Sequence, residues 1–193
     1  MQNIEQILLF IIEIEQLKDI LRKSRPVGLK RYENSAEHSW HVALSAMLLK
    51  EYSNSPINIE HVIKMLLIHD LGEIDAGDKI IYDRNCPQQI SSERVSVERL
   101  FAILPETMAT QYISLWHEFE AGKTNEAKFA KAIDRVPPLL HNLHDNGHSW
   151  QKHGIDKQQV YELNGKAISN GSESLWAAIR QKLDQAVKDG ILR

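Results

Sequence analysis

Apolar residues recur every three or four positions through most of the chain, which is the spacing that places them on one face of an α-helix. No segment shows the strict two-residue alternation that is typical of a half-buried β-strand. The pattern therefore predicts an all-α fold, a helical bundle that forms one domain over residues 1–193. The predicted helices cover roughly residues 3–22, 35–52, 59–71, 92–104, 106–121, 124–136, 139–143, 155–168 and 175–187.

The first predicted helix, roughly residues 3–22, carries more apolar residues than one helix face needs. Phe10 and Ile12 widen its apolar stripe, so we expect the helix to be buried over much of its surface. The continuous apolar run at residues 7–12 is too short to span a bilayer, and glutamates bracket it. We therefore expect a core helix, no membrane partner and a cytoplasmic location.

Residues 72–92 are predicted to form a long polar loop between two helices. Two glycines and Pro87 favour irregular structure there, and Ser91 or Ser92 is placed to cap the next helix. Connections of this length without secondary structure of their own are usually functional or disordered. The loop is therefore a candidate part of a functional site.

Composition narrows the classes of function. The chain has 193 residues, of which 42% are hydrophobic and 25% are charged, as is ordinary for a globular domain with a substantial core. The formal net charge of −3 provides no overall basic field, so we expect no nucleic-acid partner. The single cysteine, Cys86, excludes an internal disulfide and a zinc site built from thiolates.

Basic residues gather between the first two predicted helices, where Pro26 and Gly28 indicate a loop. These cations suit the solvated C-terminal end of a helix, because its dipole is negative there. They equally suit an anion-binding surface, and the pattern alone leaves both interpretations open. The basic residues of this segment are Arg22, Lys23, Arg25, Lys30 and Arg31.

Titratable side chains occur beside the apolar helices at three places in the chain. His69 and Asp70 follow the apolar run at residues 62–68, while His38 belongs to the preceding helix and Asp134 to a later one. Imidazole and carboxylate ligands without thiolates suit a divalent ion such as Mn²⁺, Co²⁺, Fe²⁺, Ni²⁺, Zn²⁺ or Mg²⁺. Each residue alone also has an ordinary explanation as a core or surface group, and basic neighbours could pair with Asp134.

The order of these residues along the chain resembles the H…HD…D pattern of the HD-domain superfamily of metal-dependent phosphohydrolases. The 5′-deoxynucleotidase-like branch is the most similar, and the resemblance spans roughly residues 5–190. It implies one divalent metal ion between helices and hydrolysis of nucleoside 5′-monophosphates to nucleoside and phosphate by a homodimer. The segments that carry it are Ala36-Glu37-His38-Ser39, Ile68-His69-Asp70-Leu71-Gly72-Glu73 and Ala132-Ile133-Asp134-Arg135. The implied metal ligands are His38, His69, Asp70 and Asp134.

The resemblance also implies roles for two further carboxylates. Glu73 lies one helical turn beyond Asp70 and matches the acid/base glutamate of the nucleotidases, which would protonate the departing ribose oxygen or position the water. Asp78 matches a position that contacts the substrate and supports catalysis. The alternatives are a solvated carboxylate at a helix end for Glu73 and a turn residue for Asp78.

A phosphate substrate also needs cationic donors. Lys79 follows the second of these carboxylates, and Arg22, Lys23 and Arg25 precede the first ligand histidine. Of these cations we expect Lys23, Arg25 and Lys79 to contact phosphate. The chain has Lys23-Ser24 where the nucleotidases have an Arg-Trp pair associated with choosing deoxyribose. The sugar preference is therefore left open.

Two other interpretations use the same residues. A hydrolase of a cyclic nucleotide or a nucleoside polyphosphate would share the metal chemistry, and a regulatory module with a degenerate site would share only the fold. Dinuclear HD enzymes need additional histidines between the HD pair and the last aspartate. Only His117 lies there, which favours a single metal ion and monophosphate hydrolysis.

Overall fold

The computed structural model describes residues 2–82 and 86–193, and for residues 86–90 it describes the backbone only. Within these residues the regular structure is entirely helical, with one isolated β-bridge between Leu21 and Asn34, so the predicted all-α class is confirmed. The α-helices are α1 (Gln2–Glu13), α2 (Ser35–Leu49), α3 (Ile59–Ile68), α4 (Glu73–Ala76), α5 (Cys86–Phe101), α6 (Glu106–Ala121), α7 (Asn125–Asp134), α8 (Val136–His144), α9 (His148–His153), α10 (Lys157–Gly171) and α11 (Glu173–Lys188). Short 3₁₀ segments follow α1 at Ile14–Asp19 and α2 at Lys50–Tyr52.

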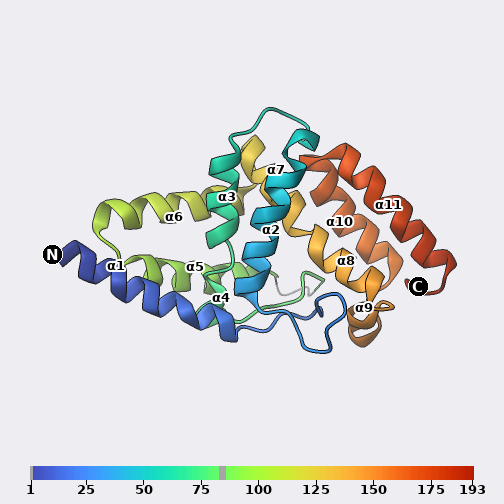
Figure 1. Ribbon diagram of the computed structural model, residues 1–193, viewed down its shortest axis with the longest axis horizontal. Helices are drawn as coiled ribbons and strands as arrows, with labels where there is room; N and C mark the ends of the chain where they lie inside the picture. Colours follow the sequence, from blue (N-terminus) through green and yellow to red (C-terminus); the bar gives the residue numbers. More distant parts are fainter. Residues whose placement is uncertain (1, 83–85) are drawn as a thin grey trace.

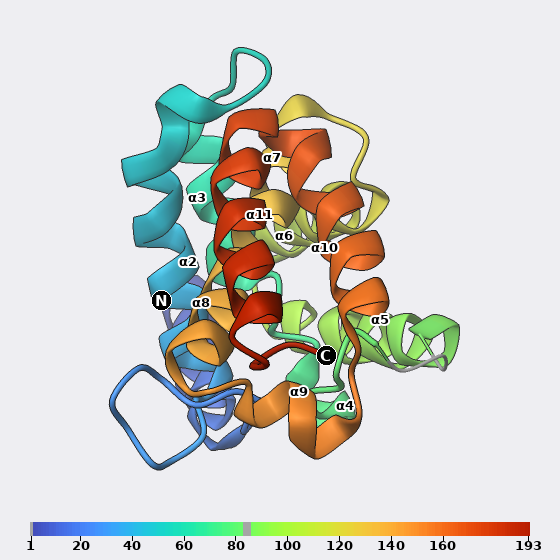
Figure 2. The ribbon, with the colours of Figure 1, turned by 90° about the vertical axis from the view of Figure 1, so that its right-hand side faces the viewer.

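Helix α7 lies at the centre of the bundle and packs against α2, α3, α6 and α10 (Figure 1). Its Ile133 belongs to the larger hydrophobic core, which α2, α3, α5 and α6 also build. Val136, just beyond its end, belongs to a second core under α8, α10 and α11, which lie together in Figure 2. Asp134 therefore lies at the junction of the two cores.

Capping residues fix where the central helices begin and end. Asn34 caps α2 and forms a reciprocal capping box with Glu37, as its residue type predicts. Thr124 caps α7, and Gly122 ends α6 in the left-handed conformation at φ 60°. The cap at Asn34 also sets the register of α2, which places His38 in the first turn of that helix.

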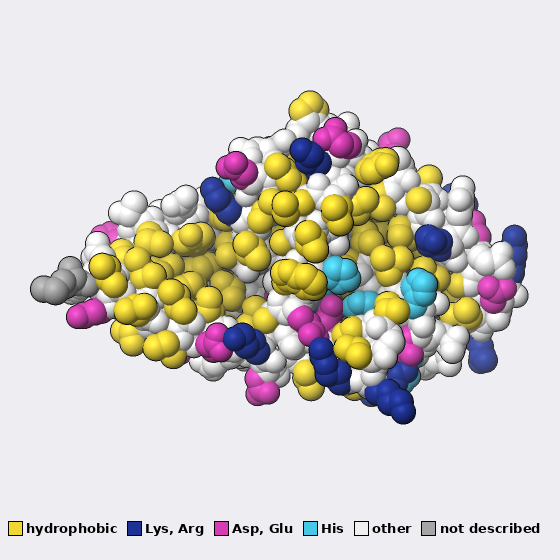
Figure 3. Space-filling view, in the orientation of Figure 1, with side chains coloured by type: hydrophobic (Ala, Val, Ile, Leu, Met, Phe, Trp, Pro, Cys, Tyr) yellow, Lys and Arg dark blue, Asp and Glu magenta, His cyan; other side chains and the backbone are white. Residues whose placement is uncertain are grey.

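The predicted burial of the first helix was wrong. Helix α1 ends at Glu13 and has no buried residue, and Ile4 and Ile12 are 63% and 67% exposed. The reason is that, among the described residues, α1 packs mainly on α5 and the following 3₁₀ segment. Phe10 and Ile7 face that contact, while most other apolar side chains of α1 face outward. Figure 3 shows the hydrophobic side chains exposed at this end of the molecule.

Two other predicted boundaries were also wrong. The loop expected at residues 72–92 contains the short helix α4, and α5 begins at Cys86 rather than at the expected serine caps. Pro87 lies in the first turn of α5, where a proline removes no intrahelical hydrogen bond. No helix in the described ranges is both long enough and apolar enough to cross a membrane.

Candidate metal centre

Three predicted ligands from three helices converge at the centre of the bundle. His38 comes from α2, His69 follows α3, and Asp134 ends α7; one ligand atom of each lies within 4.8 Å of the others. His38 Nε2 lies 3.0 Å and His69 Nε2 lies 3.4 Å from the same oxygen, Asp134 Oδ1. Both histidines are buried, so solvent screens the charges around these two rings only weakly.

The orientation of His69 indicates a cation site. Its Nδ1 donates a hydrogen bond to the Leu66 carbonyl oxygen at 2.8 Å, which leaves the lone pair on Nε2. That nitrogen is buried without a hydrogen-bond partner and faces Asp70 Oδ1 at 3.1 Å as well as Asp134. A lone pair facing two carboxylates is unfavourable alone, but it is the donor set that a divalent ion requires. The residues therefore fit the metal ion that the sequence predicts.

His38 has a carboxylate on each side of its ring. Asp134 faces Nε2, and Glu33 Oε2 lies 3.3 Å from Nδ1. If Nε2 binds a metal ion, the ring proton must be on Nδ1, where Glu33 is placed to accept it. Glu33 was not among the predicted site residues, because a glutamate five positions before a histidine in the sequence gives no signal of this pairing.

Asp70 completes the predicted set of four. One of its oxygens faces His69, and the other accepts a 2.6 Å hydrogen bond from Arg22 Nη1. The structure thus brings all four predicted ligands together. His117, the histidine between the His69-Asp70 pair and Asp134 in the sequence, is exposed on α6 and lies outside this set.

Burial and neighbouring charges shift the pKa values of the carboxylates in opposite directions. Burial alone would raise the pKa of Asp134, but the hydrogen bond from His38, the nearby imidazole of His69 and the charge of Arg135 hold it well below its usual value. Burial and then the nearby charge of Asp70 raise the pKa of Glu73 well above its usual value. The site therefore combines a firmly ionised ligand with a carboxyl group that retains its proton more readily than a free glutamate.

Glu73 is held in position from the start of α2. Its side chain is buried, and its Oε2 accepts a 2.5 Å hydrogen bond from Ser35 Oγ. Burial is also the main reason why the pKa of Asp78 is raised, although Arg22 opposes the shift. Both predicted catalytic carboxylates thus lie next to the ligand cluster, joined to it through Arg22.

Arg22 is the main site residue that the predicted set omitted. Its largely buried guanidinium lies 3.8 Å from Glu73 Oε1 and 3.9 Å from Asp78 Oδ1, in addition to its bond to Asp70. Backbone pairing aligns this segment with the start of α2, because Arg22 N–H donates to the Glu33 carbonyl oxygen at 2.8 Å. The cluster of basic residues between the first two helices indicated that a cation could reach the site, but it did not distinguish Arg22 from its neighbours.

The cluster opens into a cleft of about 310 Å³. Arg22, Glu73, Asp78 and Lys79 line it together with the ligands His69, Asp70 and Asp134. Lys131 and Arg135, the basic neighbours of Asp134 in the sequence, also line it. An adjoining smaller cleft shares several of these residues and adds Lys23, Ser24, Trp150 and Asn164.

Two of the three residues predicted to contact phosphate lie at the clefts, and the third does not. Lys79 and Lys23 lie at the clefts, and Lys23 Nζ is 3.7 Å from Asp78 Oδ2. Arg25 lines neither cleft, because its guanidinium forms two hydrogen bonds of 2.7 and 2.8 Å with Asp145. The structure therefore does not bring Arg25 together with the other predicted residues.

Comparison with known proteins identifies related sequences. The chain is 29% identical over 143 residues to 5′-deoxynucleotidase HDDC2 from Xenopus laevis, which covers 72% of this chain and 69% of the relative. It is 28% identical over 137 residues to the protein of the same name from Homo sapiens, covering 69% of this chain and 65% of that one. The chain thus spans about two thirds of the length of these relatives.

Solved structures extend the likeness to the whole chain. A "Predicted metal-dependent phosphohydrolase" from Magnetospirillum magnetotacticum is 42% identical, with a TM-score of 0.94 over 99% of this chain and 96% of that one. An HD-domain phosphohydrolase from Listeria innocua is 19% identical, with a TM-score of 0.62 over 95% of this chain and 88% of that one, and shares the fold. A family model described as HD domain matches residues 14–176. With this match and the histidine and aspartate cluster that the fold assembles, the chain belongs to the HD-domain family.

Proposed function

We propose that this protein is a metal-dependent phosphoric monoester hydrolase that converts nucleoside 5′-monophosphates into nucleoside and phosphate. The observation that carries the proposal is the position of His69 Nε2. This buried nitrogen has no hydrogen-bond partner and faces two carboxylates, and the buried carboxyl group of Glu73 lies beside the cluster. The names of the curated relatives, 5′-deoxynucleotidases, support this substrate class. The basic residues in the adjoining clefts suit a phosphate group.

In this proposal His38, His69, Asp70 and Asp134 hold one divalent ion. When bound, such an ion supplies Lewis-acid polarisation of a phosphoryl oxygen and lowers the pKa of a water molecule. Glu33 orients His38 through Nδ1, and the Leu66 carbonyl orients His69 through its own Nδ1. The metal could be Mn²⁺, Co²⁺, Fe²⁺, Ni²⁺, Zn²⁺ or Mg²⁺, since the donor set suits several of them.

Glu73 acts as the general acid. Ser35 donates to Oε2, so the carboxyl proton resides on Oε1, the oxygen nearer to Arg22. During hydrolysis the water oxygen forms a bond to phosphorus, the bond between phosphorus and the sugar oxygen breaks, and Glu73 gives its proton to that leaving oxygen. The proton that the attacking water loses returns to the Glu73 carboxylate, which restores the acid for the next turnover. The raised pKa of Glu73, caused first by burial, keeps this proton available closer to neutral pH.

The remaining charged groups bind the substrate. Arg22, Lys23 and Lys79 provide cationic donors at the clefts, and Arg135 is a further one. Asp78 is placed between Arg22 and Lys23, so it fixes both donors and can accept a hydrogen bond from a sugar hydroxyl. Arg25 stays outside this proposal because it pairs with Asp145.

The test is a panel of ribo- and deoxyribonucleoside monophosphates assayed for phosphate release with each divalent ion. We expect turnover by the wild-type chain and a loss of at least about 100-fold in kcat for Glu73→Gln with metal content unchanged, the scale of one general acid. Asp75→Asn is the matched control, since Asp75 lies on the same short helix but pairs with Arg99. A metal-loaded wild-type protein that releases no phosphate from the panel would refute the proposal, and release only from cyclic nucleotides or polyphosphates would redirect it.

We further propose that the protein forms a homodimer through α1 and α2. Figure 3 shows exposed hydrophobic side chains gathered over these helices, and apolar surfaces of this extent mark interaction sites. The exposed residues are Ile4, Leu8, Leu9, Ile11 and Ile12 of α1 and Trp40, Leu44, Met47 and Leu48 of α2. Sedimentation should give a dimer for the wild type and a monomer for the combined Leu9→Lys and Leu48→Lys variant. The cytoplasmic location stays a prediction from the sequence.

A further inference from the structure

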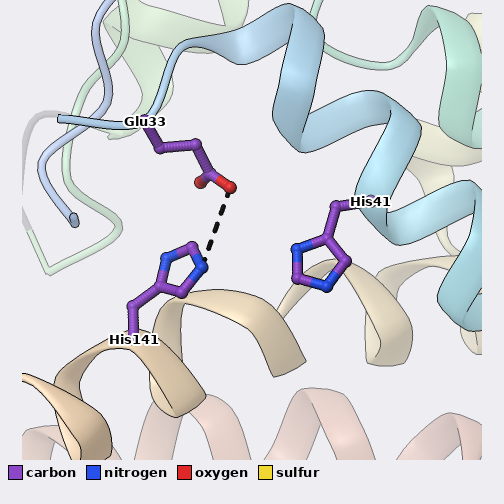
Figure 4. Close-up of side chains that lie close together, drawn as sticks. All are labelled: Glu33, His41 and His141. Atoms are coloured by element: carbon purple, nitrogen blue, oxygen red, sulfur yellow. Dashed lines mark ion pairs between the residues drawn. The ribbon is translucent and has the colours of Figure 1, made fainter. Parts of the chain in front are cut away.

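A second set of metal-ligating side chains lies outside the metal centre. Glu33 precedes α2, His41 lies within α2, and His141 lies in α8, so three separate parts of the chain contribute. One ligand atom from each lies within 4.8 Å of the other two. Figure 4 shows both imidazole rings and the carboxylate turned toward a common space between them.

The hydrogen bonding of His141 turns one ring nitrogen into that space. His141 Nδ1 lies 3.1 Å from Ser24 Oγ, so Nε2 is the atom that faces Glu33 Oε1. The 3.9 Å between Nε2 and Oε1 is too long for a hydrogen bond. Ligands about 2.1 Å from a tetrahedral zinc ion lie about 3.4 Å apart, so a small side-chain rotation would fit this pair to one ion.

Burial makes these groups suitable as ligands. Glu33 and His141 are only 2% and 3% exposed. Glu33 Oε2 faces His38 Nδ1 at 3.3 Å and Arg22 Nε at 3.5 Å, so Oε1 is the oxygen turned toward His141. His41 is half-buried, and its ring stacks on that of His141 with centroids 6.1 Å apart, so the space can be reached from solvent.

We propose that Glu33, His41 and His141 form a second divalent-cation site, distinct from the metal centre and suited to Zn²⁺. Two imidazoles and one carboxylate are a donor set that zinc accepts, with water in the remaining position. Glu33 serves both sites through different oxygens, Oε1 toward His141 and Oε2 toward His38. An ion here ties the segment that carries Arg22 to α2 and α8, and so fixes the cationic edge of the cleft.

The test counts zinc ions bound by the full-length chain. After removal of metal, the protein is equilibrated with Zn²⁺ alone and separated from free ion, and zinc per chain is measured by elemental analysis. We expect two ions for the wild type, one for His41→Gln and one for His141→Gln. His144→Gln is the matched control, since His144 is exposed on the same helix as His141, and it should keep two. A wild type with one ion, or His41→Gln and His141→Gln variants that keep two, would overturn the proposal.

A second measurement separates ion binding from folding defects. Asp134→Asn weakens the metal centre, so the thermal midpoint of this variant should still rise with Zn²⁺ if the second site binds. Adding His41→Gln to that variant should remove the rise, because His41 is half-buried and its replacement leaves the core intact. An equal zinc-dependent rise in the single and double variants would contradict the assignment. Neither readout requires turnover, so the result is independent of the proposed phosphohydrolase activity.

Discussion

Replacing Arg22 by methionine tests whether this guanidinium holds the charged site together. Methionine keeps most of the side-chain volume but removes the positive charge and the 2.6 Å hydrogen bond to Asp70. It also removes the cation that lies 3.8 Å from Glu73 and 3.9 Å from Asp78. These carboxylates are themselves largely buried, so water cannot replace the lost partner.

The expected loss is about 3–5 kcal/mol in the free energy of unfolding, the range measured when one partner of a buried ion pair is removed. That is a large part of the roughly 5–15 kcal/mol that stabilises a typical domain. Arg99→Met is the matched control, because Arg99 also bonds two carboxylates, at 2.7 Å to Asp75 and 2.8 Å to Glu13, but is 44% exposed. Exposed ion pairs contribute about 0.2–1 kcal/mol each. Arg22→Met should therefore lose more stability than Arg99→Met, because its ion pairs are buried and not because they are shorter.

The pH dependence of the loss follows from the two raised pKa values. Glu73 and Asp78 have folded-state pKa values above their usual 4.5 and 3.8, mainly through burial, and Arg22 opposes both shifts. Ionising such a group destabilises the folded state as pH rises above the unfolded-state value, and without Arg22 this penalty grows. The deficit of Arg22→Met should therefore be larger at pH 7 than at pH 5.

Urea unfolding followed by tryptophan fluorescence measures the deficit, since Trp116 is buried and donates a 3.1 Å hydrogen bond to the His69 carbonyl oxygen. The two variants and the wild type are compared at pH 7 and pH 5. A loss at pH 7 no larger than that of Arg99→Met would refute the buried-charge reasoning. A deficit that does not shrink at pH 5 would show that lost packing, and not charge, is responsible.

Three other changes give distinct outcomes. Glu73→Gln should raise stability at pH 7 in urea unfolding, because the folded-state pKa of Glu73 lies above its unfolded value and its ionisation therefore destabilises the fold. Asp134→Asn should lower Mn²⁺ content at a fixed Mn²⁺ concentration in elemental analysis, while Asp75→Asn should not, since only the former faces both histidines. Gly171→Ala should lower the free energy of unfolding by about 1–3 kcal/mol in urea unfolding, because the added Cβ would lie 2.4 Å from the Lys128 carbonyl oxygen where α10 packs on α7. Unchanged stability would show that the two helices can move apart there at little cost.

Much of the site could be predicted because its residues are fixed by helix ends. Asn34 and Gly122 are capping residues with clear sequence signals, and the apolar run before His69 sets the end of α3. Once the helices are placed, His38, His69, Asp70 and Asp134 need only the family order to be recognised as one group. The structure brings all four together at the meeting point of α2, α3 and α7.

The site residues that the sequence did not predict, and the predictions that were wrong, depend on features that helical periodicity does not report. Arg22 and Glu33 reach the site through backbone pairing between a loop and the residues before α2, which depends on contacts far apart in space. Apolar periodicity indicates which residues avoid water but not which surface covers them, so α1 was predicted to be buried. Pro87 was interpreted as a helix breaker, although the first turn of a helix accepts proline.

The balance of charge explains why this site needs both an arginine and a metal ion. Five carboxylates surround the largely buried guanidinium of Arg22, namely Glu33, Asp70, Glu73, Asp78 and Asp134. Lys23, the further cation near Asp78, is 40% exposed, so solvent screens part of its effect. The raised pKa values of Glu73 and Asp78 follow first from burial and also from the charge of Asp70, which repels a second ionised group. Arg22 offsets part of this excess negative charge, and the remainder favours binding of a dication rather than water at the His69 cluster.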